Sequence, residues 1–369
     1  MRILQVTSHL AVGGIPRYVL SLSLRLAAKG HEVILASDGT LPEAYRHENL
    51  KHWAFPLRTS AEFGLQVFWA TRQLEKRLRE EPVDILHAHT RVGQVVAERI
   101  SRRLHIPYVT TWHGIYTTRL GRRLWPCTGE RAIAISGPVR EHLLRDFHVP
   151  QRRIRLVYNG IPVSHYLTPP DPEALLTYRQ RWQIRAGQPV IGGIGRLAAG
   201  RVKGFDSILL VAYLLKEEVP DLQVLIVGDG PRRPFLEDVV RRFGLQDRVR
   251  FVGVVSDIRI PLGLMDVFIF PSRWPEAFGL TLVEAMASGR AVVATEVGAV
   301  PEIVRQGIDG WLVPPEDPSA LTEKVLSLLK DRDAALRLGR KAQERAREMF
   351  DLNRMADEIE GVYREVVSR

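Results

Sequence analysis

The sequence predicts an α/β protein with two domains, each built on a parallel β-sheet. The chain has 369 residues, which is more than one hydrophobic core usually serves. Short apolar segments alternate with segments of helical period through both halves, as in βαβ units. A stretch at residues 159–172 contains an Asn-Gly pair and several prolines. We expect a linker between the domains there.

The first half opens with a strand, a Gly13-Gly14 pair and a helix, which is the order of a βαβ unit. The glycine pair lacks the Gly-x-Gly-x-x-Gly pattern, so a nicotinamide cofactor is not indicated. The expected strands are residues 2–7, 31–36, 52–57, 83–88, 107–112, 132–135 and 154–158, and the expected helices are 16–29, 62–80, 91–104 and one after Ser136.

The second half repeats the alternation. Its last helix places apolar residues three and four positions apart, from Met355 to Val366, as a docked amphipathic helix requires. The expected strands are residues 189–195, 222–227, 249–253, 266–270, 291–294 and 310–314, and the expected helices are 205–218, 280–288, 318–330, 334–350 and one from about 352.

The composition is that of a globular protein, with 45% hydrophobic and 25% charged residues. No apolar stretch reaches the roughly 18–20 residues that a membrane span needs. Residues 1–6 run directly into the first strand, so we expect no signal peptide. The single cysteine, Cys127, rules out an internal disulfide framework and suits a reducing compartment. We therefore expect a cytoplasmic protein.

The net charge of +10 lies in the first half. Residues 1–160 hold 24 basic and 13 acidic residues, whereas residues 161–369 hold 28 and 29. One interpretation is a solubility surface. The other is a domain that meets an anionic lipid leaflet or a phosphorylated glycan. Nucleic acid is not indicated, because no zinc-finger, RNP-like or zipper pattern appears.

The stretch from Trp274 to Glu284 combines two carboxylates with a helix start. The helix that follows Gly279 is almost wholly apolar, yet it carries Glu284, and a buried carboxylate needs a partner. Glu276 lies eight positions earlier. The amides of Leu280 and Thr281 in the first helical turn favour an anion. Carboxylates for hydroxyl groups and amides for phosphate suit a sugar nucleotide, although an arginine partner for Glu284 is the simpler structural alternative.

Charged and polar residues follow three other expected strands, where ligands bind in open parallel sheets. Arg196 and Lys203 lie between a strand and a helix, and both side chains suit a diphosphate. His113 follows the strand that ends at Trp112, and His87 and His89 lie at the end of the strand at 83–88. A lone histidine at a strand end is often structural.

These residues together carry a resemblance to a known family. Glu276 and Glu284 match a Glu-x7-Glu motif, within Pro-Ser-x-x-x-Glu-x-Phe-Gly-Leu-x-x-x-Glu-Ala-Met-Ala-x-Gly. Gly195-Arg196-Leu197 followed by Lys203-Gly204 matches a second motif. The chain resembles the retaining glycosyltransferases of group 1, or family 4, which have the GT-B fold.

The resemblance implies two Rossmann-like domains that face each other across a cleft, with the last helix crossing back to the first domain. On this basis we expect an acceptor-side domain at 1–165, a nucleotide-sugar domain at 166–350 and the crossing helix at 351–369. A formal Asp-x-Asp match at residues 331–333 lies between two expected helices, and we expect a solvated turn there.

The resemblance also implies the site. His113 and Glu276 are the expected catalytic residues. The donor is expected to be a UDP- or GDP-linked sugar, with no cofactor and no metal. The motif that contains Lys203 is about two residues longer than the common form, so Lys203 and Arg201 are both candidates for the phosphate contact. The expected donor-binding residues are Gly13, Gly14, Arg196, Lys203, Gly228, Val254, Glu276, Phe278, Gly279, Leu280, Thr281 and Glu284. His89 matches only a looser tendency of the family.

Basic residues alternate with leucine and tryptophan shortly after His113. Arg119, Arg122, Arg123 and Trp125 are the expected interface to an anionic acceptor or membrane, and a solvated loop is the alternative. We expect a glycan or glycolipid acceptor of cell-envelope polysaccharide or lipopolysaccharide synthesis, with peripheral attachment to the inner face of the cytoplasmic membrane. A nucleotide-sugar epimerase of the same fold and a non-catalytic sugar-nucleotide-binding module are the competing functions.

Overall fold

The computed structural model describes residues 1–11, 13–59, 61–200 and 202–368. The chain divides into two compact units. The first unit contains residues 1–161 together with the segment from Asp351 onward, and the second unit runs from Pro162 to Phe350. The division therefore lies four residues before the expected boundary at 165.

The first unit is built on a seven-stranded sheet with the order β3-β2-β1-β4-β5-β6-β7. All of its neighbouring strands are parallel. The strands are β1 (Arg2–His9), β2 (Glu32–Asp38), β3 (Leu50–Ala54), β4 (Ile85–Ala88), β5 (Tyr108–Trp112), β6 (Arg131–Ala134) and β7 (Ile154–Leu156). The helices are α1 (Gly14–Ala28), α2 (Leu65–Glu80), α3 (Arg91–Leu104), α4 (Leu120–Leu124), α5 (Gly137–Arg145) and α15 (Leu352–Val367), with short 3-10 turns at Glu43–Tyr45 and Gln151–Arg153.

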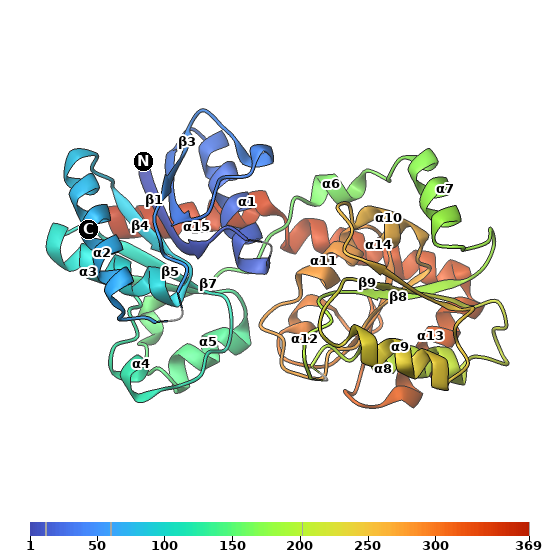
Figure 1. The fold of residues 1–369 in the computed structure, drawn as a ribbon. Coiled ribbons are helices and arrows are strands. Elements are labelled where there is room, and N and C mark those ends of the chain that lie inside the picture. The colour runs from blue at the N-terminus through green and yellow to red at the C-terminus, as the bar shows by residue number, and fades with distance from the viewer. Residues whose placement is uncertain (12, 60, 201, 369) are drawn as a thin grey trace. The chain divides into compact units, whose positions relative to one another are not determined.

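Successive strand residues point to opposite faces of this sheet, so each face has its own apolar core. Ile3 packs in the core that contains α1 and α15, whereas Leu4 packs in the core that contains α2 and α3. Figure 1 shows α1 and α15 side by side across this sheet. The last helix of the sequence therefore completes the core of the first unit, where Ile359 and Tyr363 are fully buried.

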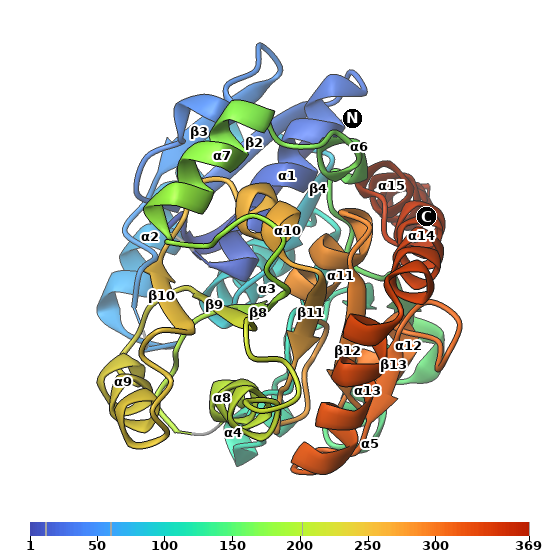
Figure 2. The ribbon, with the colours of Figure 1, turned by 90° about the vertical axis from the view of Figure 1, so that its right-hand side faces the viewer.

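The second unit is built on a six-stranded parallel sheet with the order β10-β9-β8-β11-β12-β13, which fans across Figure 2 in this order. The strands are β8 (Val190–Ile194), β9 (Gln223–Val227), β10 (Val249–Gly253), β11 (Val267–Phe270), β12 (Ala291–Thr295) and β13 (Trp311–Val313). The helices are α6 (Val163–Leu167), α7 (Pro172–Arg181), α8 (Phe205–Leu214), α9 (Arg233–Arg242), α10 (Arg259–Leu264), α11 (Leu280–Ala287), α12 (Val300–Ile303), α13 (Pro318–Lys330) and α14 (Arg332–Met349).

The segment expected as a linker contains helix α6, and α7 begins at its end. The side chain of Asp171 caps α7 by accepting a hydrogen bond from the amide of Glu173, and Pro172 occupies the first turn. An Asp-Pro pair is a helix-start signal, so the proline-rich composition was misleading here. At residues 331–333, Asp331 caps α14 and Asp333 lies inside its first turn, so the expected turn is a helix start.

Residues 159–161 meet the start of α15 at a close backbone contact. The amide of Leu352 donates to the carbonyl of Ile161 over 2.8 Å. A Cβ atom on Gly160 would lie 2.7 Å from the carbonyl oxygen of Asp351 and 2.8 Å from the Cα of Leu352. Only a glycine fits at this position without moving the helix.

We predict that Gly160→Ala and Gly361→Ala change stability in opposite directions. Gly160→Ala should lower the free energy of unfolding by about 1–3 kcal/mol, because the helix must shift. Gly361 lies inside α15 with no atom within 4 Å of its Cβ position, so alanine there should stabilise by about 0.5–1 kcal/mol. Denaturant unfolding measures both values. Equal effects of the two substitutions would contradict the close contact.

Candidate functional site

In the second unit, the candidate donor-site residues gather beyond the carboxyl ends of β8 and β11. These two strands are neighbours at the centre of the sheet, where the strand order changes direction. Such a switch point is where open parallel sheets bind ligands. Arg196 follows β8 directly, and its side chain is exposed. Among the residues that the structure describes, none forms an ion pair or hydrogen bond with the Arg196 guanidinium.

Lys203 and Glu276, which come from different loops, form an ion pair. The Nζ atom of Lys203 lies 2.6 Å from Oε1 of Glu276. The hydroxyl of Ser272, a residue that is almost fully buried, donates to the same oxygen over 2.6 Å. Lys203 was expected at a phosphate and Glu276 at a sugar, and the structure brings the two side chains together. Arg201, the other phosphate candidate, lies outside the described residues.

Two glycines hold these loops close to each other. Gly204 has a φ of +63°, and a Cβ atom on it would lie 1.8 Å from the carbonyl oxygen of Pro271. Gly298 has a φ of +54°, and its Cβ would lie 2.3 Å from the carbonyl oxygen of Glu276. The amide of Ala299 also donates to that carbonyl over 2.9 Å. The backbone of Glu276 is therefore fixed by neighbours that leave no room for larger residues.

Helix α11 begins directly after Gly279, whose φ is +153°. The amides of Leu282 and Val283 both bond to the carbonyl of Gly279. The amides of Leu280 and Thr281 have no acceptor in the part of the chain that the structure describes, as expected for a first helical turn. Phe278 is buried, and its ring packs edge-on against Phe350 at 5.7 Å.

Glu284 lies inside α11 with none of its surface exposed. The hydroxyl of Tyr166, from α6, donates to its Oε1 over 3.0 Å. One partner of the buried carboxylate is thus a tyrosine hydroxyl. Because none of the surface of Glu284 is exposed, a ribose hydroxyl reaches this carboxylate only after a local rearrangement.

Gly228 and Val254 lie at the ends of β9 and β10. The amide of Gly228 donates to the carbonyl of Gly253 over 2.8 Å. The φ of Gly228 is +120°, and a Cβ there would lie 2.0 Å from the carbonyl oxygen of Gly195. The side chain of Val254 is 78% exposed. Gly228 therefore packs the strand ends together, and the backbone near Val254 is open to a ligand.

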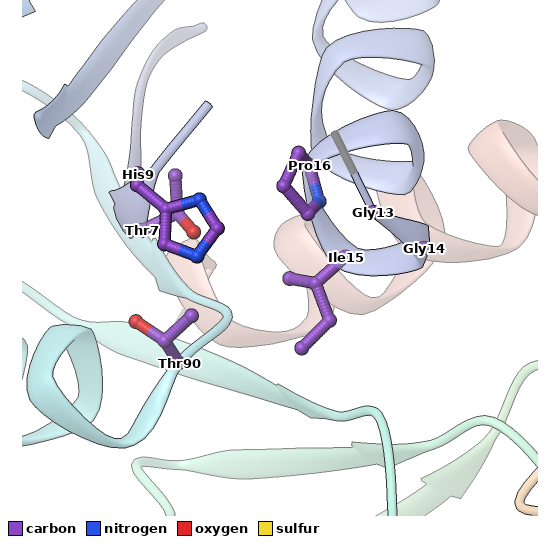
Figure 3. A pocket seen from close by; sticks show the side chains of 7 residues that line it. All are labelled: Thr7, His9, Gly13, Gly14, Ile15, Pro16 and Thr90. Carbon is purple, nitrogen blue, oxygen red and sulfur yellow. The ribbon is translucent and has the colours of Figure 1, made fainter. Parts of the chain in front are cut away.

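In the first unit, Gly13 and Gly14 line a cavity of about 220 Å³. Gly14 is the first residue of α1, and Gly13 precedes it. Figure 3 shows Thr7, His9 and Thr90 on the opposite side from Ile15 and Pro16. The glycine pair thus leaves open space beside the start of a helix, which suits an anion.

His113 is the end of a row of buried polar residues in the first unit. Its Nε2 lies 3.3 Å from Nδ1 of His89, a fully buried residue. Burial lowers the pKa of His113 to about 3 and holds the pKa of His89 well below its usual value. The ring of Tyr18 contacts His113 edge-on at 4.6 Å. His113 is therefore neutral at physiological pH and has a defined orientation.

Two of the four residues expected at the acceptor or membrane interface are partly buried and contact other residues of the first unit. Arg122 forms an ion pair with Glu62, and its Nε donates to the same carboxylate over 2.6 Å. Trp125 stacks on Phe63 with 5.5 Å between the ring centres. These contacts attach α4 to the loop before α2. Arg119 and Arg123 are exposed, and a guanidinium nitrogen of Arg123 lies 2.9 Å from Nε2 of His148, which is also exposed.

The sequence analysis missed the residues that hold the site residues in place. Ser272 was visible only as part of a motif, and Tyr166 lies in a segment expected to be a linker. A signal existed for Gln5, because it is a polar residue within the apolar strand Ile3-Leu4-Gln5-Val6. A fully buried glutamine requires hydrogen-bond partners.

The arrangement in the second unit can bind an anion and hydroxyl groups together. The cationic groups are Arg196 and Lys203, and the helix amides of Leu280 and Thr281 add partial positive charge. The hydrogen-bond acceptors are the carboxylates of Glu276 and Glu284. A phosphorylated sugar or a nucleotide has the complementary groups.

The comparisons with known proteins cover both units. Residues 12–165 match the family model "Glycosyltransferase Family 4", and residues 176–345 match "Glycosyl transferases group 1". The chain is similar to N-acetyl-alpha-D-glucosaminyl L-malate synthase from Bacillus anthracis, with 26% identity over 98% of this chain and 96% of that one.

Solved structures show the same fold. A glycosyltransferase from Rickettsia africae has a TM-score of 0.88 and 25% identity, covering 100% of this chain and 99% of that one. HepE from Anabaena, solved with UDP-glucose, has a TM-score of 0.83 and 21% identity, covering 99% and 100%. The expected fold class, with two Rossmann-like parallel-sheet units, is confirmed as GT-B. The chain belongs to the group 1 and family 4 glycosyltransferases.

Proposed function

We propose that the protein is a retaining glycosyltransferase that moves a sugar from a nucleoside diphosphate to a glycan, lipid-linked or phosphorylated acceptor. The observation that carries this proposal is the ion pair of Lys203 and Glu276 beside the unpaired Arg196. It places cationic groups and a carboxylate at one strand-end site. Support comes from the relative HepE, which was solved with UDP-glucose.

The ion pair of Lys203 and Glu276 indicates how the donor is bound. The diphosphate takes Lys203 away from Glu276, and the released carboxylate accepts hydrogen bonds from the donor sugar. Glu284 accepts hydrogen bonds from the ribose hydroxyls after a local rearrangement. His113 contacts the donor sugar. Both carboxylates thus have hydrogen-bond donors when the donor is bound.

The chemical step breaks the bond between the anomeric carbon and the diphosphate oxygen. Lys203, Arg196 and the amides of Leu280 and Thr281 stabilise the negative charge that develops on the leaving group, so we propose that no metal is needed. The acceptor oxygen forms the new bond on the same face, and its proton moves to the leaving phosphate. Ser272 still donates to Glu276, which makes Glu276 a weaker nucleophile and disfavours a double displacement.

We propose cell-envelope polysaccharide or lipopolysaccharide synthesis as the process, with an anionic membrane surface as the place. The first unit carries most of the positive charge. Residues 1–160 have 24 basic and 13 acidic residues, and residues 351–369 of the same unit have three basic and five acidic residues. The net charge of the first unit is therefore +9. Among the described residues, no helix is long and apolar enough to cross a bilayer. Attachment is therefore proposed at the surface.

The proposed contact surface consists of α4 and the start of α2. Its apolar side chains are large and exposed, with 72% for Leu120, 76% for Leu124 and 79% for Leu65. Arg119 and Arg123 flank the leucines of α4. Exposed leucines between arginines fit the interface of an anionic leaflet.

The donor panel is the direct test of the function. We predict that incubation with one UDP- or GDP-linked sugar and an acceptor releases the nucleoside diphosphate and forms a new glycoside with the donor's anomeric configuration. The rate should be unchanged by EDTA. Nuclear magnetic resonance of the products reads the configuration. An altered sugar still attached to the nucleotide would mean an epimerase, and binding without turnover would mean a binding module.

We predict that Lys203→Ala lowers kcat by about 10²-fold or more, because one pre-placed charge at a developing anion has that effect. Lys341→Ala is the matched control, since Lys341 also forms an ion pair in the second unit, with Glu344 at 2.7 Å. Steady-state kinetics with the identified donor measures both. Near-normal turnover of Lys203→Ala would move the phosphate contact to Arg201.

We predict that the double variant Arg119→Ala/Arg123→Ala binds phosphatidylglycerol-containing vesicles about 30-fold more weakly, because each arginine near an anionic surface contributes about 1 kcal/mol. Co-sedimentation at low salt measures the bound fraction. Arg152→Ala/Arg153→Ala removes the same charge from exposed positions of the first unit and should bind as the unmodified protein does. Equal binding by both variants would exclude this surface.

A further inference from the structure

We propose that a buried chain of hydrogen bonds fixes His113 in one neutral tautomer, so that its Nδ1 accepts a hydrogen bond from a hydroxyl of the transferred sugar. Gln5, His89 and Tyr363 are then positioning residues, because they act on His113 and do not touch the sugar. The sugar contact rests on the proposed function. The tautomer itself follows from the side chains of the first unit.

The chain of contacts connects three strands and the last helix. From His113 it passes to His89, whose Nε2 lies 2.5 Å from Oε1 of Gln5 on β1. The amide nitrogen of Gln5 lies 3.1 Å from the hydroxyl of Tyr363 on α15. That hydroxyl lies 2.6 Å from Nδ1 of His87 on β4. Nε2 of His87 lies 2.7 Å from the hydroxyl of Thr111 on β5.

All the intermediate members are sealed from water. Gln5, His87, His89, Thr111 and Tyr363 each have none of their surface exposed. A buried imidazole must therefore take its hydrogen-bond partners from the protein. Burial also lowers the pKa of His87 and of His89 well below the usual value. Each ring is neutral at physiological pH and carries one N–H and one bare nitrogen.

The side-chain amide of Gln5 determines which atom donates in each hydrogen bond between Gln5 and His113. Its oxygen only accepts, so Nε2 of His89 carries the hydrogen and Nδ1 of His89 is bare. Nε2 of His113 must then donate to that bare nitrogen. His113 is left with a bare Nδ1, which has no hydrogen-bond partner among the described residues of the chain. It is available as an acceptor.

The same amide determines which atom donates in each hydrogen bond between Gln5 and Thr111. Its nitrogen donates to the hydroxyl oxygen of Tyr363, so the tyrosine directs its own hydrogen to Nδ1 of His87. Nε2 of His87 then carries a hydrogen and donates to Thr111. Each hydrogen bond in this series then has one donor and one acceptor. A reversed amide of Gln5 would reverse each of these bonds, so the orientation of one side chain decides the tautomer of His113.

The loop that carries His113 is held independently. The amide of Tyr116 donates to Nε2 of His142 over 3.0 Å, and the other ring nitrogen of His142 lies 2.6 Å from the carboxylate of Asp146. The ring of Tyr18 contacts His113 edge-on. The loop thus fixes the place of the ring, and the buried chain fixes which nitrogen bears the hydrogen.

The test is a nitrogen-15 resonance experiment on histidine-labelled protein without substrate, which distinguishes protonated from bare ring nitrogens. We expect His113 to show a protonated Nε2 and a bare Nδ1. Tyr363→Phe removes one hydroxyl and keeps the ring, so the amide of Gln5 loses its second partner and His113 should show a mixture of tautomers. With the identified donor, kcat should fall about tenfold, the equivalent of one hydrogen bond.

Tyr108→Phe is the matched control. Tyr108 is a buried tyrosine of the same unit. Its hydroxyl bonds to Glu98, which does not belong to the buried series of hydrogen bonds. Its removal should leave the His113 resonances unchanged. If Tyr363→Phe does not fold, Gln5→Leu removes the acceptor of His89 and should produce the same mixture.

A protonated Nδ1 in the unmodified protein would overturn the proposal. So would His113 resonances that stay unchanged in both Tyr363→Phe and Gln5→Leu. The resonance measurement needs no turnover, so a failure of the proposed function would leave its result standing. Conversely, normal transfer with a reversed tautomer would remove this proposal alone.

Discussion

The first unit depends on a hydrogen bond between its first strand and its last helix, from the amide nitrogen of Gln5 to the hydroxyl of Tyr363. A strand cannot bury a glutamine without partners, and α15 brings the partner from the far end of the sequence. The same helix fills the apolar core with Ile359 and Val362. The helix α15 therefore contributes both to the apolar core and to the hydrogen bonds of Gln5. His113 lies at the end of this series of hydrogen bonds.

In the second unit, an ion pair satisfies two charged side chains of the candidate site. Lys203 and Glu276 neutralise each other across two loops, and Gly204 allows the backbone of its loop to lie close to Pro271 in the other. Arg196 has no such partner among the described residues, so its guanidinium can bind an anionic ligand. A site of this kind is stable without ligand and can exchange its internal partners for a diphosphate and a sugar. The preformed charges then need little reorganisation during the reaction.

The order of strands and helices was largely predictable from the sequence. The spacing of apolar residues and the positions of glycines are local signals for these elements. Ile3, Ile85 and Val109 lie on one face of the sheet, and two residues further along each strand come Gln5, His87 and Thr111 on the same face. This two-residue spacing predicts a cluster of polar side chains on one face of the sheet. It does not predict Tyr363, which lies near the other end of the sequence from its partner Gln5. Arg122 and Trp125 were expected at a surface because nothing local indicates Glu62 and Phe63 as their partners.

The central claim is that the donor diphosphate replaces Glu276 as the partner of Lys203. A crystal structure of the protein with its intact donor measures this most directly. The account predicts that Nζ of Lys203, now 2.6 Å from Glu276, contacts a phosphate oxygen, with Glu276 on the sugar hydroxyls. A bound donor beside an unbroken Lys203–Glu276 ion pair would contradict it.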